Sequence, residues 1–126
     1  MNRVVYDTAV LVACDRNERK VWAEHRVRLE SGRVPLVPSV VVAQASRSPK
    51  QVQLRRFLRG CEVVALGEAD AHRVGALLGK SRTSDVVDAC VVALAAERHA
   101  DVVSGDIDDA KRLVDASRAR IVIFRP

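Results

Sequence analysis

The sequence predicts an α/β fold with a mostly parallel sheet, and two recurring patterns support this prediction. Short runs of apolar, largely β-branched residues recur along the chain, as expected for strands that are covered on both faces. Between them, apolar residues repeat at the i, i+3, i+4 and i+7 spacing of a helix face. Strands that alternate with helices form right-handed crossovers, which keep the strands parallel. We therefore expect a central sheet of four to five strands flanked by helices.

The individual elements can be placed from the same two patterns. The apolar runs predict buried strands at Val4 to Tyr6, Val34 to Val37, Val63 to Leu66, Val102 to Ser104 and Ile121 to Phe124. Helical stripes lie within residues 54–61, 71–78, 87–94 and 110–114, and further helices are expected after the first and second strands. Pro49 precedes the helix predicted from Gln51 to Arg59, where a missing amide donor does little harm.

Length and composition indicate a single domain, residues 1–126. A chain of 126 residues fits one domain of ordinary size and leaves no room for a second. Apolar residues make up 48% of the chain, and no stretch is rich in Gly and Ser, so disorder is not expected. No apolar run approaches the roughly 18 residues needed to cross a bilayer, which argues against a membrane protein.

The cysteines and the N-terminal segment indicate the cellular compartment in which the protein is expected. The three cysteines are odd in number, share no C-x-x-C spacing and lie in apolar stretches, as reduced core thiols do. The segment ending at Cys14 is similar to a lipoprotein cleavage box, but Asp7 interrupts its apolar run. We therefore expect a cytoplasmic protein.

The charge balance suggests a polyanionic partner. A formal charge of +5 and a pI near 9.6 indicate a surface excess of Arg, although an Arg-rich proteome would give the same balance. With one Trp, one Tyr and two Phe, the chain has little aromatic surface on which bases could stack. A nucleic-acid partner would therefore be held mainly through its phosphates.

Aspartates occur where predicted strands end or helices begin. Asp7 follows the first strand, Asp85 and Asp88 open a helix, and Asp106 and Asp109 follow the fourth strand. The carboxyl ends of parallel strands meet at one edge of a sheet, where ligands bind in α/β folds. Carboxylate oxygens suit Mg²⁺ or Mn²⁺, whereas no Cys/His cluster has the spacing of a zinc site. The pattern predicts a divalent metal site.

Each aspartate also has an ordinary structural explanation. Asp7 can cap the helix that follows it, and the helix dipole accounts for Asp85 in a first turn capped by Ser84. Asp88 lies in a mostly apolar helix, so its charge needs a partner. If Asp7, Asp88 and Asp106 met within about 4 Å, each pair would repel by roughly 4 kcal/mol at an effective dielectric of 20. Their joint placement therefore favours a bound cation.

In these motifs the chain resembles PIN-domain ribonucleases, and most closely the VapC-type toxins of bacteria. The resemblance covers nearly the whole chain and depends on three ordered segments: Val5-Tyr6-Asp7-Thr8, Ser84-Asp85-Val86-Val87-Asp88-Ala89 and Ser104-Gly105-Asp106-Ile107-Asp108-Asp109. It implies a PIN-like three-layer fold in which Asp7, Asp88 and Asp106 form the catalytic metal site. Further residues are implied in the same site: Asp109 as a metal-binding helper, Asp85 nearby, and Thr8 and Ser104 as hydroxyls that orient the carboxylates.

One residue departs from the family pattern. Family members commonly carry a Glu on the helix after the second strand, and this chain has Gln44 at that position. An amide carbonyl can still accept a hydrogen bond, but the site loses one negative charge. Weaker metal affinity, a changed preference between Mg²⁺ and Mn²⁺, or lost activity could follow.

The resemblance also implies an activity and partners. The reaction would be metal-dependent hydrolysis of RNA phosphodiester bonds, with a divalent ion lowering the pKa of an attacking water. VapC-type toxins typically form homodimers and are held inactive by a cognate antitoxin. Helices bearing Val21, Trp22 and Leu29, and Leu54, Phe57 and Leu58, could form an apolar groove for a partner, although such apolar stripes more often belong to the core. Candidate RNA-binding residues beside the acidic motifs are Lys80, Arg82, Arg47 and Lys50.

Two alternative functions compete with a ribonuclease toxin. Gln44 is compatible with a degenerate PIN domain that binds RNA or protein without cutting it. An aspartyl phosphotransferase is less consistent, because Asp7-Thr8-Ala9 lacks a second Asp two residues on. No nucleotide-binding glycine motif is present. The histidines His25, His72 and His99 have no Ser or Cys partner motif and are assigned no catalytic role.

Overall fold

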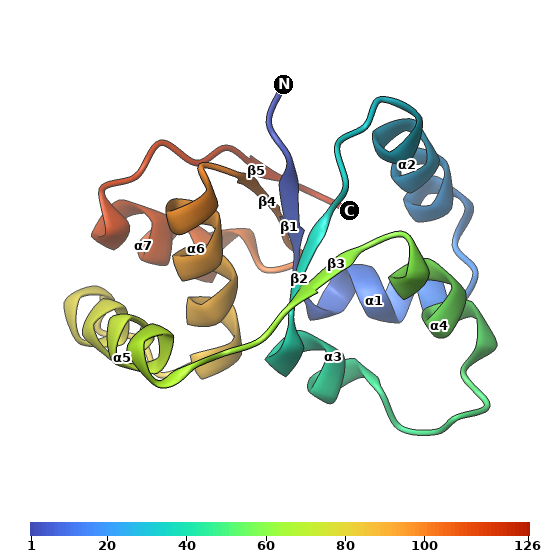
Figure 1. Ribbon diagram of the computed structural model, residues 1–126. Coiled ribbons are helices and arrows are strands. Elements are labelled where there is room, and N and C mark those ends of the chain that lie inside the picture. Colours follow the sequence, from blue (N-terminus) through green and yellow to red (C-terminus); the bar gives the residue numbers. More distant parts are fainter.

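A five-stranded, all-parallel sheet forms the middle layer of the protein (Figure 1). A computed structural model describes residues 1–126, with the strands in the order β3-β2-β1-β4-β5. Val5 of β1 lies opposite Leu36 of β2 and Val102 of β4, so β1 is the central strand. The strands are β1 (Val4–Tyr6), β2 (Leu36–Pro38), β3 (Glu62–Val64), β4 (Asp101–Val103) and β5 (Ile123–Phe124).

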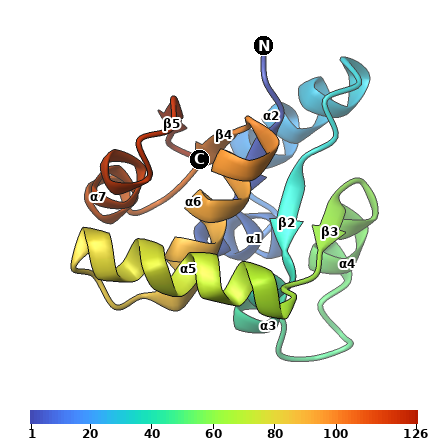
Figure 2. The ribbon, with the colours of Figure 1, turned by 60° about the vertical axis from the view of Figure 1, so that its left-hand side comes forward.

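Helices cover both faces of this sheet, as the alternating pattern predicts. Figure 1 shows α5, α6 and α7 on one side of the sheet and α1, α2 and α4 on the other, and Figure 2 shows α5 lying across α6. No helix has the length and apolar character needed to span a membrane. The helices are α1 (Thr8–Asp15), α2 (Arg19–Glu30), α3 (Ser39–Ala45), α4 (Val52–Arg59), α5 (Glu68–Ser81), α6 (Val86–Arg98) and α7 (Ile107–Ser117).

The core consists of two clusters of buried apolar residues. The larger cluster joins β1, β2 and β4 to α1 and α4 on one face of the sheet and to α6 on the other, and it contains Tyr6, Leu36 and Phe57. A smaller cluster lies between α5, α6 and α7 around Leu77 and Leu113. Burial of these apolar side chains stabilises the layers at roughly 25 cal/mol per Å² of surface removed from water.

The outer strands differ from the sequence prediction. The runs at 63–66 and 121–124 were predicted as buried strands, but Val63 on β3 is 47% exposed and Phe124 on β5 is 44% exposed. Both strands lie at an edge of the sheet, where fewer helices cover them. Strand boundaries also shift, since β2 begins at Leu36 and β3 ends at Val64. The helical stripe that reached Cys61 ends at Arg59, with Gly60 as the C-cap.

The predicted apolar groove on α2 and α4 is mostly core. Val21, Leu54 and Phe57 are buried in the larger cluster, and Trp22 and Leu58 pack against it. Only Leu29 of this set is exposed, at 36%. The apolar stripes of these two helices therefore pack against the sheet and each other rather than forming a free docking surface.

Candidate metal centre

Asp7 links the end of β1 to the loop that follows β4. It is the N-cap of α1, and its carboxylate accepts hydrogen bonds from the amide of Val10 at 3.3 Å and from that of Gly105 at 2.9 Å. The side chain is only 6% exposed. Burial raises the pKa of Asp7, while the Ser104 hydroxyl and the backbone amides act in the opposite direction. The capping role expected from the sequence is thus confirmed, and it fixes the carboxylate at the edge of the sheet.

Helices α6 and α7, like α1, each have an aspartate as the N-cap. Asp85 is the N-cap of α6 and accepts a hydrogen bond from the amide of Asp88 at 3.0 Å. Asp106 is the N-cap of α7 and accepts one from the amide of Asp109 at 3.2 Å. The prediction that Ser84 caps α6 is wrong, because α6 begins at Val86 and Asp85, one residue after Ser84, is the N-cap whose carboxylate accepts from the N3 amide. Each helix therefore presents a pair of aspartates in its first turn.

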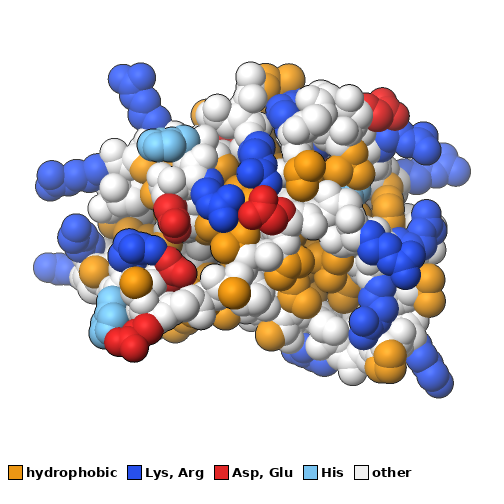
Figure 3. Space-filling model, viewed as in Figure 1, with side chains coloured by type: hydrophobic (Ala, Val, Ile, Leu, Met, Phe, Trp, Pro, Cys, Tyr) orange, Lys and Arg blue, Asp and Glu red, His pale blue; other side chains and the backbone are white.

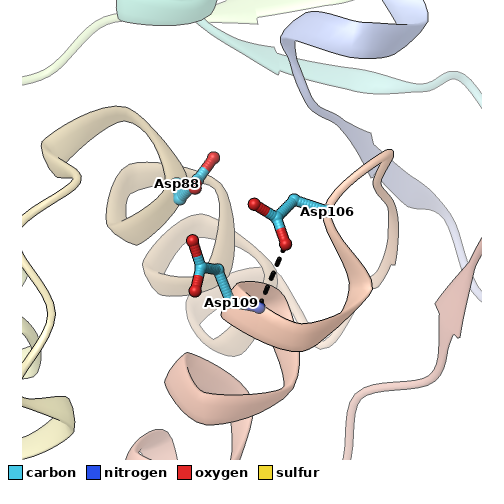
Figure 4. A group of neighbouring side chains, drawn as sticks. All are labelled: Asp88, Asp106 and Asp109. Carbon is cyan, nitrogen blue, oxygen red and sulfur yellow. Dashed lines mark hydrogen bonds between the residues drawn. The ribbon is translucent and has the colours of Figure 1, made fainter.

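These two helix starts bring three carboxylates together (Figure 4). One oxygen from each of Asp88, Asp106 and Asp109 lies within 4.8 Å of the others, and Figure 4 shows the side chains turned toward one another. The pKa of Asp88 is raised to about 6, first by its partial burial and then by the charges of its aspartate neighbours. Those neighbours are Asp85, Asp7, Asp106 and Asp109.

No salt bridge neutralises the cluster. None of the chain's 21 Lys and Arg residues forms a salt bridge with Asp88, Asp106 or Asp109. Like charges held this close repel unless a cation lies between them. The donors are all carboxylate oxygens, with no His or Cys among them, which fits a hard cation such as Mg²⁺ or Mn²⁺. The residues present are thus suited to a divalent ion.

Comparison with known proteins identifies the fold. No protein-family model and no curated protein matches the sequence. Among solved structures, the chain aligns at a TM-score of 0.71 with a chain from a crystal structure of VapBC2 from Rickettsia felis. That crystal contains VapBC2 bound to a DNA fragment from its promoter. The alignment covers 98% of each chain at 16% sequence identity. The chain has a PIN-like fold. The resemblance inferred from the motifs is therefore confirmed at the level of the fold.

In this PIN-like fold, the neutral Gln44 lies beside the start of α1. The hydroxyl of Thr8 donates a hydrogen bond to the side-chain oxygen of Gln44, which joins α1 to α3. Ser104 has a different local role, because its hydroxyl donates to the backbone oxygen of Asp106 at 3.2 Å and accepts from its amide at 3.1 Å. Both hydroxyls predicted to support the site lie next to its aspartates.

The predicted RNA-binding residues lie at different distances from the acidic cluster along the PIN-like fold. Arg82 is exposed in the segment directly before α6, on the way to Asp85. Lys80 lines a hollow beside Asp115 and Ser117, near the C-terminal end of α7 and thus away from the helix start that carries Asp106. Arg82 is therefore the better placed of the two.

The other two basic candidates lie in the connection between α3 and α4. The Arg47 guanidinium donates to the backbone oxygens of Ala43 and Ser46, at 3.0 and 2.9 Å. Lys50 is exposed. A basic residue that sequence analysis missed is Arg112, one helical turn from Asp109. The charge of Asp106 raises the pKa of Asp109, and the charge of Arg112 partly opposes that increase. The i, i+3 spacing between an acidic and a basic residue on α7 is the signal that indicates this proximity.

Proposed function

We propose that this chain is a metal-dependent endoribonuclease that hydrolyses RNA phosphodiester bonds with Mg²⁺ or Mn²⁺. The observation that carries the proposal is the unbalanced group of Asp88, Asp106 and Asp109 at the carboxyl edge of the sheet in a PIN-like fold. A divalent ion at such a group stabilises charge on the scissile phosphate and lowers the pKa of an attacking water. Asp7, predicted for the same site, lies outside this group of three, and both of its carboxylate oxygens accept backbone hydrogen bonds. Its charge still acts on Asp88.

The protein's own nucleophiles do not offer another route to cleavage. Burial raises the pKa values of Cys14 and Cys61 to about 12, so neither thiol ionises near neutral pH. The hydroxyls of Thr8 and Ser104 are engaged in hydrogen bonds with Gln44 and with the backbone of Asp106. Water is thus the nucleophile that the site favours, and the carboxylates hold the cation and orient the reaction.

An extended polyanion fits the surroundings better than a small ligand. Asp106 is exposed, and the carboxylates do not line the hollows found between α5 and α6 or between α2 and α4. Lys and Arg side chains are spread over the face of the protein in Figure 3, consistent with the net charge of +5. Phosphate contacts along a strand of RNA would use this charge.

The comparison with VapBC2 suggests that the nuclease is the toxin of a toxin–antitoxin pair. We therefore infer a cognate antitoxin as a protein partner and a homodimer as the assembled form. Co-expression with the product of a neighbouring short reading frame, followed by size-exclusion chromatography with light scattering, tests both inferences. A chain that stays monomeric and binds no such product would contradict them.

Cleavage of a structured RNA by the purified chain tests the proposed activity. We expect cutting in Mg²⁺ or Mn²⁺, none in EDTA, and at least a hundredfold loss in the isosteric Asp88→Asn variant. Asp108→Asn is the matched control, since Asp108 is exposed on the same turn of α7 as Asp109 and is not one of the three clustered aspartates. Cutting that survives both EDTA and Asp88→Asn would refute the proposal.

A non-catalytic PIN-like binding module is the second candidate, and the neutral Gln44 is the observation that favours it. Its side-chain oxygen already accepts a hydrogen bond from Thr8, so α3 adds no charge to the site. Such a module would bind RNA with an affinity that depends on salt and not on Mn²⁺. Binding without cleavage, in a folded sample free of antitoxin, would support the module over the nuclease.

A further inference from the structure

A basic hollow lies beside α2 and α4, on the opposite side of the sheet from α6 and α7 (Figure 1). Its volume is about 610 Å³, and its lining contains three arginines and one acidic residue: Arg19, Arg26, Arg56 and Glu30. Arg26 lies 3.9 Å from Glu30 in an exposed ion pair, whereas Arg19 and Arg56 form no salt bridge. The hollow therefore carries an excess of positive charge.

The same hollow contains the chain's one tryptophan, which is held in a fixed position. The indole Nε1 of Trp22 donates a 3.0 Å hydrogen bond to the backbone oxygen of Cys14, and the ring meets Phe57 edge-on at 5.1 Å between centroids. The guanidinium of Arg56 lies over the Trp22 ring, 5.3 Å from its centroid. A guanidinium held over an aromatic ring offers its outer face to a further planar group. Because Arg56 is exposed, that group can come from solution.

A track of basic residues joins the carboxyl edge of the sheet to this hollow. Arg47 and Lys50 are exposed in the connection from α3 to α4, and Arg55 and Arg59 are exposed on α4 itself. Arg55 and Arg59 are related by four positions, a spacing at which like charges on a helix repel. Figure 3 shows Lys and Arg side chains gathered on this side of the molecule, over α2 and α4. A polyanion bound along the track would relieve this repulsion.

An RNA strand fits this surface better than an acidic protein segment does. Carboxylates and phosphates would pair equally with the arginines of the track, but only a nucleic acid brings a planar base to stack on Arg56. The other aromatic residues near the hollow offer no stacking surface, because Tyr6 and Phe57 are fully buried. One stacking position beside several phosphate contacts is therefore the combination that this side of the protein provides.

We propose that the hollow at Trp22 and Arg56 is a second RNA-binding site, where one unpaired base stacks on the Arg56 guanidinium while Arg55 and Arg59 bind the phosphates of the adjoining strand. This inference rests on the proposed action on RNA and locates a contact with that substrate far from the clustered aspartates, across the sheet. RNA with an unpaired nucleotide outside the cleaved bond is thereby favoured over fully paired RNA.

Binding of a short fluorescein-labelled oligouridylate in EDTA tests the site without cleavage, and thermal unfolding checks that each variant is folded. Arg56→Lys keeps the charge but removes the planar group, and it should weaken binding by at least roughly fivefold. Arg59→Lys is the matched control, because a phosphate contact needs only the charge, and it should bind within about twofold of wild type. An abasic strand of the same length should bind equally to wild type and to Arg56→Lys.

The salt dependence of the same binding tests the basic track. In a double variant with Arg55→Gln and Arg59→Gln, the slope of log affinity against log salt should fall by about 1.4, since each phosphate contact on a single strand contributes about 0.7. A double variant with Arg118→Gln and Arg120→Gln removes the same charge from exposed positions beyond the end of α7. That control should leave the slope unchanged.

The outcomes separate this inference from the proposed nuclease. An oligouridylate that does not bind, or that binds equally to wild type and Arg56→Lys, would overturn the second site while the nuclease proposal stands. Polyglutamate that binds as tightly, with the same sensitivity to Arg56→Lys, would also overturn it, because the hollow would then recognise an acidic protein segment. A chain that binds the oligouridylate through Arg56 but cuts no RNA in Mn²⁺ would overturn the nuclease and support the second site.

Discussion

Asp7 and Gly105 lie 98 positions apart in the chain, and the amide of Gly105 donates a 2.9 Å hydrogen bond to the carboxylate of Asp7. The contact depends on a close approach of two segments. A Cβ added at Gly105 would lie 2.7 Å from the Cβ of Ala9, in the first turn of α1. The absence of a side chain at Gly105 therefore lets the loop after β4 reach the carboxylate that follows β1.

We expect Gly105→Ala to destabilise the protein and to weaken Mn²⁺ binding. The added methyl group has to push α1 away from the loop, at a cost of about 1 to 3 kcal/mol, and the hydrogen bond to Asp7 lengthens with it. Urea unfolding measures the first effect and Mn²⁺ titration the second. Gly79→Ala, in the last turn of α5 where an added Cβ meets no atom within 4 Å, is the matched control and should be neutral or stabilising. Equal effects of the two substitutions would contradict the close approach.

The stability of the metal-free protein should depend on pH through Asp88. Its pKa is raised to about 6 from an ordinary value of 3.8, so the folded state holds this proton more tightly than the unfolded state does. Ionisation of Asp88 therefore lowers the free energy of unfolding as pH rises from about 4 to 6. In EDTA at pH 7.5, Asp88→Asn should be more stable than wild type by about 1 kcal/mol after allowance for solvent screening.

Urea unfolding at pH 4 and pH 7.5 checks this effect. The advantage of Asp88→Asn should shrink at pH 4, where the wild-type carboxyl is protonated in the folded protein. Mn²⁺ should stabilise the wild-type protein at pH 7.5 and the variant much less, because binding to the folded state alone adds to its stability. A variant that is less stable than wild type at pH 7.5 in EDTA would contradict the unfavourable interactions assigned to Asp88.

Because capping is local, the sequence placed aspartates at the starts of these helices, although it assigned the N-cap of α6 to Ser84, one residue too early. Asp85 with Asp88, and Asp106 with Asp109, are related by three positions, so the spacing alone fixes which amide meets which carboxylate. The contact between Thr8 and Gln44 spans 36 positions and depends on how α1 packs on α3. No local pattern encodes that distance, and the hydrogen bond could not have been predicted.

The burial of the two edge strands also could not be predicted from local sequence patterns. The apolar runs at β3 and β5 match those of the central strands in composition, so they also predicted buried strands. The order β3-β2-β1-β4-β5 puts them at the two edges, and Val63 and Phe124 are exposed as a result. Strand order is set by the crossovers of the whole chain, which hydrophobic periodicity within a segment does not contain.

A second pH effect is expected from His25, with the opposite sign to that of Asp88. The ring is buried, stacks on Phe57 at 3.8 Å between centroids and lies 2.9 Å from the Tyr6 hydroxyl through Nδ1. Burial, followed by the charge of Arg28, lowers the pKa of His25 to about 4. The unfolded state takes up this proton at about pH 6.5, so stability is lost as pH falls from there toward 4.

Nuclear magnetic resonance titration of the His25 ring and urea unfolding test this effect together. The ring should titrate near pH 4. Between pH 7 and pH 4.5, the free energy of unfolding of the wild-type protein should fall by about 2 kcal/mol because of this group. The variant His25→Gln should lack that share of the pH dependence, whereas the exposed His72→Gln should keep it. A His25 ring that titrates at pH 6.5 or above would show that its neutral form is not favoured by the fold.

Gln51 holds the connection between α3 and α4 with all the hydrogen-bonding groups of its side-chain amide. Its oxygen accepts from the amides of Arg47 at 2.6 Å and Ser48 at 2.9 Å. Its nitrogen donates to Asp15 of α1 and to the backbone oxygen of Ala45, each at 3.1 Å. Because Ala45 ends the helix that carries Gln44, this amide ties the position of α3 to α1.

We expect Gln51→Ala to destabilise the protein by about 2 to 3 kcal/mol, since each of these hydrogen bonds contributes about 1 ± 0.5 kcal/mol. Hydrogen exchange should quicken at the amides of Arg47 and Ser48, which lose their acceptor. Gln53→Ala is the matched control, because Gln53 accepts only one hydrogen bond, from Arg56, and should change stability by less than about 0.5 kcal/mol. Unchanged exchange at Arg47 and Ser48 would mean that the α3–α4 connection is held by its own backbone and not by Gln51.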